Sequence, residues 1–245
     1  SLPLMTPFFE TEGERASLQS LTWGRKSNWI PTFCGTAGSL AVEGMLLAPV
    51  GERGFLYQLT VRSTSDKPLS STFGLEGCWA SAWHCVNEDK EIDGARRCYT
   101  SLWNDSLIFD MRCGLPLFAF APMMDQPCSS TFQETDAGIV YRLAHACTLE
   151  PGEAVTVTFY WGVGFEEVAA ATSAKEMLRQ GWQHELQVTT DWLDARRWPI
   201  PDAQLERLYN TNLFFCLFYS AGITLDTEEL VLVTSRSPRY YVCLL

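Results

Sequence analysis

The amino-acid sequence predicts a mainly β protein, an antiparallel β-sandwich followed by a short α-helical C-terminal segment. Residues from about 15 to 163 form many short runs of strand-like alternation, joined by turns, with no helical pattern between them. After residues 160–164 (YWGVG) the apolar residues recur at helical spacing instead. We therefore predict a sandwich domain over residues 1–164 and a helical segment over residues 165–245, and we exclude a doubly wound parallel sheet.

The segment FLYQLTVRSTS shows the alternation of a half-buried strand. Its odd-numbered residues from Phe55 to Val61 are apolar and share one face, whereas Gln58, Thr60 and Arg62 lie on the other. A turn is predicted at residues 66–68 (DKP), directly after this strand. Further strands are predicted at residues 39–47, 73–86, 98–104, 107–112, 117–121, 138–148 and 154–161.

A tight turn is predicted between the last two of these strands. The sequence Glu150-Pro151-Gly152-Glu153 places a proline before a glycine, which suits a type II turn because glycine tolerates a positive φ. We expect the two flanking strands to form a hairpin across this turn.

Three helices are predicted in the C-terminal segment. Residues 166–180 are rich in helix formers, and Gly181 supplies a stop signal. A second helix continues toward Trp198, with Trp182, Leu186, Thr189 and Leu193 on one face. Pro201 and Asp202 then suit the first turn of a third helix.

The third helix, from Ala203 to about Ala221, contains the run LFFCLFY, whose apolar side chains surround the whole helix axis. Such a helix requires burial on all sides, and the sandwich and two preceding helices offer little surface for that. Three arrangements would bury it: the sandwich and the preceding helices wrap it, a second chain covers it, or further helices that this sequence does not contain belong beside it. Leaving several large apolar side chains exposed drives self-association, so we expect a homodimer through this helix.

The composition excludes several classes of function. A net charge of −11 without a block of Lys or Arg disfavours nucleic-acid binding. No apolar run approaches the roughly 20 residues that span a bilayer, and residues 2–9 lack the features of a signal peptide. The nine cysteines contain no C-x-x-C pair, which indicates reduced buried thiols and a cytoplasmic protein.

The order of these elements resembles the six-hairpin glycosidases. A β-sandwich is followed by a helix pair with TTDWLDARRW, a helix that starts at a proline, and the tail TSRSPRYYV. That family consists of (α/α)6-barrel glycoside hydrolases with an N-terminal β-supersandwich, of the glucoamylase and debranching types. The resemblance implies an N-terminal sandwich portion of a glycoside-hydrolase-like protein that acts on or binds carbohydrate.

The same resemblance implies an acidic stretch after the SPRYYV-like run, and here Cys243 and two leucines stand in that place. Glycoside hydrolysis generally needs two carboxylates, so we expect a truncated chain in which the catalytic pair is missing. Its substrate-positioning residues would be Arg236, Arg239 and Tyr240. The candidate carboxylates within the chain are Glu228 and Glu229, for which a solvated loop is the alternative.

Tryptophans are the candidate sugar platforms. Trp79 and Trp83 would share one face of the strand over residues 73–86, where a sugar ring could stack on them; the alternative is that both fill the sandwich core. Trp103, beside Asn104 and Asp105, is a third candidate. These residues also support a second hypothesis, a non-catalytic carbohydrate-binding or structural module.

Other chemistry finds less support in the sequence. The three histidines, His84, His145 and His184, have no metal-ligand spacing, so neither a metal nor a cofactor is expected. No G-x-S-x-G nucleophile elbow is present, which leaves an esterase as a distant third alternative.

Overall fold

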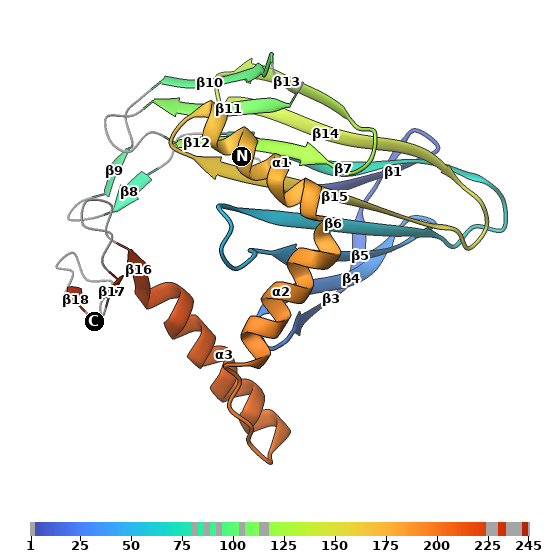
Figure 1. Cartoon of the computed structure of the whole chain (residues 1–245). Coiled ribbons are helices and arrows are strands. Elements are labelled where there is room, and N and C mark those ends of the chain that lie inside the picture. The colour runs from blue at the N-terminus through green and yellow to red at the C-terminus, as the bar shows by residue number, and fades with distance from the viewer. Residues whose placement is uncertain are drawn as a thin grey trace.

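The computed structural model describes residues 3–79, 83–85, 89–91, 95–102, 106–112, 118–223, 230–233 and 242–244. Two antiparallel sheets stack to form a sandwich, and helices lie along the outer side of the larger sheet (Figure 1). The predicted fold class, a β-sandwich followed by a helical segment, is confirmed. The helices are α1 (Glu167–Gln180), α2 (Trp182–Asp194) and α3 (Ala203–Ser220).

The two large sheets contain thirteen strands. The five-stranded sheet has the order β13 (Ser129–Thr135), β14 (Gly138–Leu149), β7 (Leu69–Trp79), β1 (Thr6–Thr11), β2 (Glu14–Ala16). The eight-stranded sheet has the order β10 (Ala95–Thr100), β11 (Leu107–Arg112), β12 (Phe118–Met124), β15 (Ala154–Gly164), β6 (Gly54–Ser63), β5 (Leu40–Leu47), β4 (Ile30–Ala37), β3 (Leu18–Lys26). Two small sheets pair β8 (Trp83–Cys85) with β9 (Asp89–Glu91), and β16 (Ala221–Ile223), β17 (Leu230–Val233) and β18 (Val242–Leu244) in that order.

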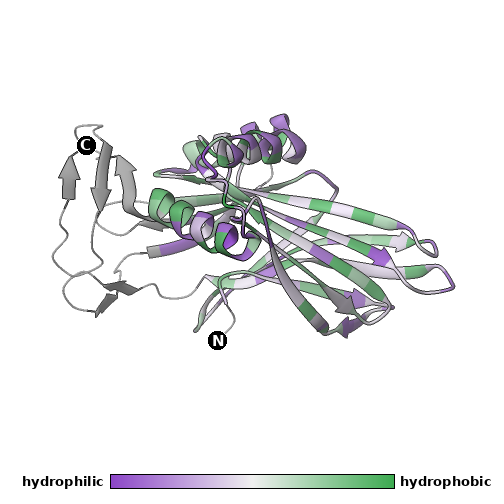
Figure 2. Ribbon diagram, turned by 90° about the horizontal axis from the view of Figure 1, so that it is seen from below, coloured by the Kyte–Doolittle hydropathy of each residue, from purple (hydrophilic) through white to green (hydrophobic). Residues whose placement is uncertain are grey.

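The main hydrophobic core lies between the two large sheets. Strand β6 contributes as its alternation predicts: Leu59 and Val61 are fully buried in this core, and Phe55 and Tyr57 pack against it. Apolar and polar residues alternate along many strands of the sandwich (Figure 2). The aromatic residues of the core include Phe9, Phe73, Trp79, Phe109, Tyr141, Phe159 and Trp161.

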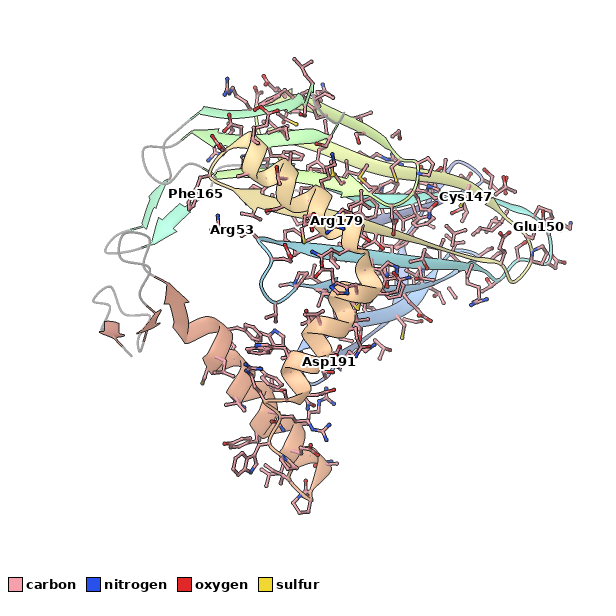
Figure 3. All side chains as sticks on the ribbon, viewed as in Figure 1. Arg53, Cys147, Glu150, Phe165, Arg179 and Asp191 are labelled. Carbon is pink, nitrogen blue, oxygen red and sulfur yellow. The ribbon has the colours of Figure 1, made fainter. Side chains whose placement is uncertain are left out.

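The turn at Glu150 forms as predicted, but the hairpin does not. Gly152 has φ of 77°, and the Glu153 N–H donates to the Glu150 carbonyl at 2.9 Å. However, β14 pairs with β7 and β13, whereas β15 pairs with β6 and β12, so the turn carries the chain from one sheet to the other. Figure 3 shows Glu150 at the tip of this connection. The residues of the turn determine where the chain reverses direction. Packing of the two sheets around the core determines which strands pair.

The continuous strand predicted over residues 73–86 is also wrong. Strand β7 ends at Trp79 in the five-stranded sheet, whereas β8 pairs with β9 in a separate two-stranded sheet. The period-2 relation between Trp79 and Trp83 therefore does not hold, because it requires one uninterrupted strand.

Helices α1 and α2 form where the sequence predicts them, separated by Gly181 with φ of 84°. Helix α1 approaches the eight-stranded sheet very closely, and small residues permit this. A Cβ atom on Gly162 would lie 1.9 Å from the Ala170 carbonyl oxygen. Ala170 and Ala174 are themselves completely buried. The contact thus requires glycine at this position of β15.

A second apolar cluster joins the outer face of the larger sheet to the helices. Met177 of α1, Leu193 of α2 and Phe214 of α3 pack with Leu56 and Tyr160 from the sheet. Helix α3 is buried on this side, but its other sides are open. Its exposed large apolar residues are Leu205, Leu208, Tyr209, Phe215, Leu217 and Phe218.

Candidate functional site

The predicted site residues fall into three groups in the structure. Trp79 belongs to the core: it is only 8% exposed, and its ring lies 5.7 Å from Phe109 and 5.0 Å from Phe120. Because its ring is buried, Trp79 fills the sandwich core rather than serving as a surface on which a sugar ring could stack. Trp83 lies in β8, where the structure describes the backbone alone. Outside the described residues are Trp103, Glu228, Glu229, Arg236, Arg239 and Tyr240.

A groove on the outer face of the eight-stranded sheet is the candidate functional site. It has a volume of about 420 Å³ and runs across β3, β4, β5 and β6, with α2 as one wall. Figure 1 shows α2 lying alongside these strands. Its lining residues are Thr22, Trp23, Gly24, Lys26, Thr32, Phe33, Cys34, Glu43, Gly44, Met45, Gln58, Thr60, Trp182 and Leu186.

Strand register explains why this part of the face is polar. Glu43 lies opposite both Cys34 and Thr60, and Thr60 lies opposite Thr156, so four strands place these residues in one row across the sheet.

The next row along the sheet contains Thr32, Met45, Gln58 and Thr158. After it come Leu47, Leu56 and Tyr160, which the helices cover. The groove therefore occupies the boundary between the polar and apolar halves of the face.

Hydrogen bonds fix several polar side chains near the groove. The hydroxyls of Thr60 and Thr156 are 2.8 Å apart, and Gln58 Nε2 donates to Thr158 Oγ1 at 3.5 Å. The Thr158 N–H donates to Asp125 Oδ1 at 2.8 Å. A sheet surface ordered in this way presents hydroxyl and amide groups in fixed positions, which lowers the entropy lost when a polar ligand binds.

An exposed aromatic residue lies on the edge strand at one end of this groove. Trp23 is 64% exposed, and its ring lies 5.4 Å from the Phe33 ring. Trp23 pairs with Phe33 in the strand register, so both side chains lie on the face of the sheet opposite Glu43 and Thr60. Phe33 lies so close to Gly44 that a Cβ atom there would approach it to 2.1 Å. On the opposite wall, the backbone N–H of Trp182 donates to the Tyr160 hydroxyl at 3.1 Å, which joins the start of α2 to the sheet.

Two ionisable groups behind this wall have raised pKa values. Burial, with a smaller effect from Asp125, raises the pKa of Tyr160 to about 12, so this hydroxyl remains protonated at neutral pH. Burial raises the pKa of Glu185 on α2 as well, and the charge of Glu52 adds to this effect. Glu185 faces the sheet, 2% exposed, and is not a lining residue of the groove.

The groove suits binding better than hydrolysis. Among its described lining residues, Glu43 is the one carboxylate, whereas glycoside hydrolysis generally uses two. Hydroxyls, an amide and exposed indole are the groups that proteins use to hold polyhydroxylated ligands, because a pyranose has a polar rim and an apolar C–H face.

The described residues contain no cluster of His, Cys, Asp or Glu that could hold a metal ion. His145 is buried, with Nδ1 2.8 Å from the Pro127 carbonyl oxygen, and His184 is exposed on α2. Within the described part of the chain, no helix is both long enough and apolar enough to cross a membrane.

Sequence reasoning missed this groove, although one signal pointed toward it. The polar face of β6 with Gln58 and Thr60 is visible in the sequence. What the sequence does not give is the order of β3, β4, β5 and β6 in the sheet, or the position of α2 beside them. Cys34 and Glu43 join the row of Thr60 only through that order.

Comparison with known proteins shows the fold. No family model and no curated protein matches the sequence. The structure is similar to a putative kojibiose phosphorylase from human microbiome, with a TM-score of 0.60 and 12% identity over 88% of this chain and 30% of that one.

It is also similar to a bacterial glucoamylase complexed with acarbose, with a TM-score of 0.54 and 8% identity over 86% of this chain and 34% of that one. The chain thus spans about a third of the length of these two proteins. These structural neighbours are carbohydrate-active enzymes, and the chain shares the fold of the part of each protein that it covers.

Proposed function

We propose that this chain is the N-terminal sandwich portion of a glycoside-hydrolase-like protein that acts on or binds carbohydrate. Its sandwich domain covers residues 1–164, and residues 165–245 form the helical linker and first helices of an (α/α)6 barrel. The fold shared with a kojibiose phosphorylase and a glucoamylase supports this proposal. In such a protein, Arg236, Arg239 and Tyr240, which lie outside the described residues, would be substrate-positioning residues.

The carbohydrate ligand, in this proposal, lies in the groove across β3 to β6. The observation that carries it is the exposed Trp23 on the edge strand β3, at one end of a groove whose floor carries a row of polar side chains. The Trp23 indole stacks on the C–H face of one sugar ring of an oligosaccharide, and Thr60 and Gln58, three strands away on β6, bond the hydroxyls of other rings. Trp83 and Trp103 remain candidates for further stacking contacts.

Titration calorimetry with maltohexaose, acarbose and kojibiose tests this proposal. Trp23→Ala should weaken binding by about tenfold, since it removes the stacking surface. Trp198→Ala is the matched control, because Trp198 is also an exposed tryptophan and does not line the groove. Equal affinities for wild type and Trp23→Ala, or no binding of any of the three sugars, would contradict the proposal.

The alternative function is a non-catalytic carbohydrate-binding or structural module, and the single carboxylate of the groove favours it for this chain taken alone. Aryl-glycoside hydrolysis distinguishes the two. Activity that disappears in Glu228→Gln or Glu229→Gln would support an enzyme within these residues, whereas sugar binding without hydrolysis supports the module.

We further propose a homodimer through α3 and a cytoplasmic location. The exposed apolar residues of α3 outside the grooves, among them Leu205 and Phe215, support the dimer because water disfavours such a surface. Six cysteines whose side chains the structure describes, Cys34, Cys78, Cys98, Cys128, Cys147 and Cys216, are free thiols, which supports a reducing compartment.

A further inference from the structure

A second groove lies between strand β3 and helix α3. It has a volume of about 570 Å³, and its lining residues are Trp23, Gly24, Arg25, Gln204, Arg207, Leu208 and Thr211. Trp23 and Gly24 also line the first groove. The two grooves therefore share Trp23 and Gly24 of the edge strand β3.

The two grooves differ in charge. The first contains Glu43 and Lys26, whereas the second contains Arg25 and Arg207 and no carboxylate among its described lining residues. Both arginines are exposed, and neither forms an ion pair with a described residue. The chain as a whole carries a net charge of −11, so two guanidinium groups without ion-pair partners among the described residues make this groove locally positive on an otherwise negative molecule.

Helix α3 contributes one of the two arginines. It begins at Ala203, so Gln204 lies in its first turn and Arg207 one turn later. The Asp202 carboxylate caps this end of the helix, where its Oδ1 accepts the Leu205 N–H at 2.8 Å, so the positive charge at the groove comes from the two guanidinium groups. Guanidinium groups bind planar carboxylates through paired N–H donors, which gives both affinity and orientation.

We propose that the joined grooves bind an acidic oligosaccharide, with a uronic acid unit between Arg25 and Arg207. Neutral sugar units of the same ligand lie in the first groove, against Thr60 and Gln58, and Trp23 stacks on the ring at the junction. This inference rests on the proposed function and specifies its substrate class.

The test compares maltohexaose with C6-oxidised maltohexaose, which differs from it only in its carboxylates. Calorimetry on the whole chain should give about tenfold tighter binding of the oxidised form. Arg25→Gln and Arg207→Gln should each reduce that preference by about two- to fivefold, the range expected of an exposed ion pair. Lys67→Gln removes the same charge from a turn outside both grooves and should leave the preference unchanged.

Trp23 provides a second readout that does not depend on charge. Trp23→Ala should weaken both sugars, whereas Trp23→Phe, which keeps an aromatic ring, should retain most of the binding and guards against misfolding of the alanine variant. Equal affinity for the two sugars would overturn the acidic specificity and leave the proposed carbohydrate function intact. The absence of binding to either sugar would overturn both.

Discussion

Replacing Glu185 by glutamine should stabilise this protein at neutral pH. The carboxyl is 2% exposed, and its Oε1 has no hydrogen-bond partner among the described residues. Burial, together with Glu52, raises its pKa in the folded state. In the unfolded chain Glu185 has a pKa near 4.3, so it is ionised at pH values where the folded chain still keeps it protonated. Its contribution to stability is complete below pH 4.3 and is lost as the pH rises through the pKa of the folded state.

The magnitude follows from the one oxygen that is both buried and unpartnered. Such a group costs about 1 to 3 kcal/mol, and a neutral amide avoids the additional cost of the charge. We expect Glu185→Gln to gain about 1 kcal/mol at pH 7, or about 3 °C in melting temperature for a chain of this length, and nothing at pH 4. Urea denaturation followed by tryptophan fluorescence at both pH values measures this difference.

Glu176 on α1 serves as a control of opposite sign. Its hydrogen bonds with Arg179 lower its pKa, so its contribution is present at neutral pH and is lost as the pH falls through the folded pKa. Glu176→Gln should therefore lose stability at pH 7 relative to acidic pH. The reasoning is wrong if Glu185→Gln is no more stable than wild type at pH 7, or if its advantage is the same at pH 4.

Three further predictions concern packing and assembly. Gly162→Ala should destabilise the fold by about 3 kcal/mol in urea denaturation, because the added methyl collides with the Ala170 carbonyl of α1; an unchanged midpoint would contradict this contact. Phe214→Ala should cost about 3 to 5 kcal/mol, whereas Phe215→Ala, at a residue that is 50% exposed, should cost less than about 1.5 kcal/mol; equal losses would show that α3 packs differently. In sedimentation equilibrium at micromolar concentration, Phe215→Glu, at an exposed residue outside both grooves, should convert a dimer into a monomer, and a wild-type protein that sediments as a monomer would refute the dimer.

The sequence predicts most elements of this fold because its local patterns are strong. The alternation in β6 and the stop at Gly181 both depend on neighbours in the chain, and both appear in the structure as expected. The turn at Gly152 is equally local, yet the pairing of its flanking strands is not. Which strands pair depends on how the two sheets share the core, and no short segment encodes that choice.

The candidate site is harder to predict for the same reason. Trp79 and Trp23 are both tryptophans in strands, but one is buried in the core and the other is 64% exposed at the edge strand of the larger sheet. Their neighbours in sequence do not distinguish them. Their exposure depends on where each strand lies in the fold: β3 is an edge strand of the larger sheet, whereas Trp79 lies in the core between the two sheets.

Alkylation of Cys34 tests most directly whether a sugar occupies the groove. Cys34 is an exposed free thiol that lines it, and Cys216 on α3 is an exposed free thiol outside both grooves. We predict that saturating maltohexaose slows the reaction of Cys34 with iodoacetamide by at least about fivefold, measured by peptide mass spectrometry, and leaves Cys216 unchanged. Equal rates at Cys34 with and without the sugar, under conditions where calorimetry detects binding, would show that the carbohydrate binds elsewhere.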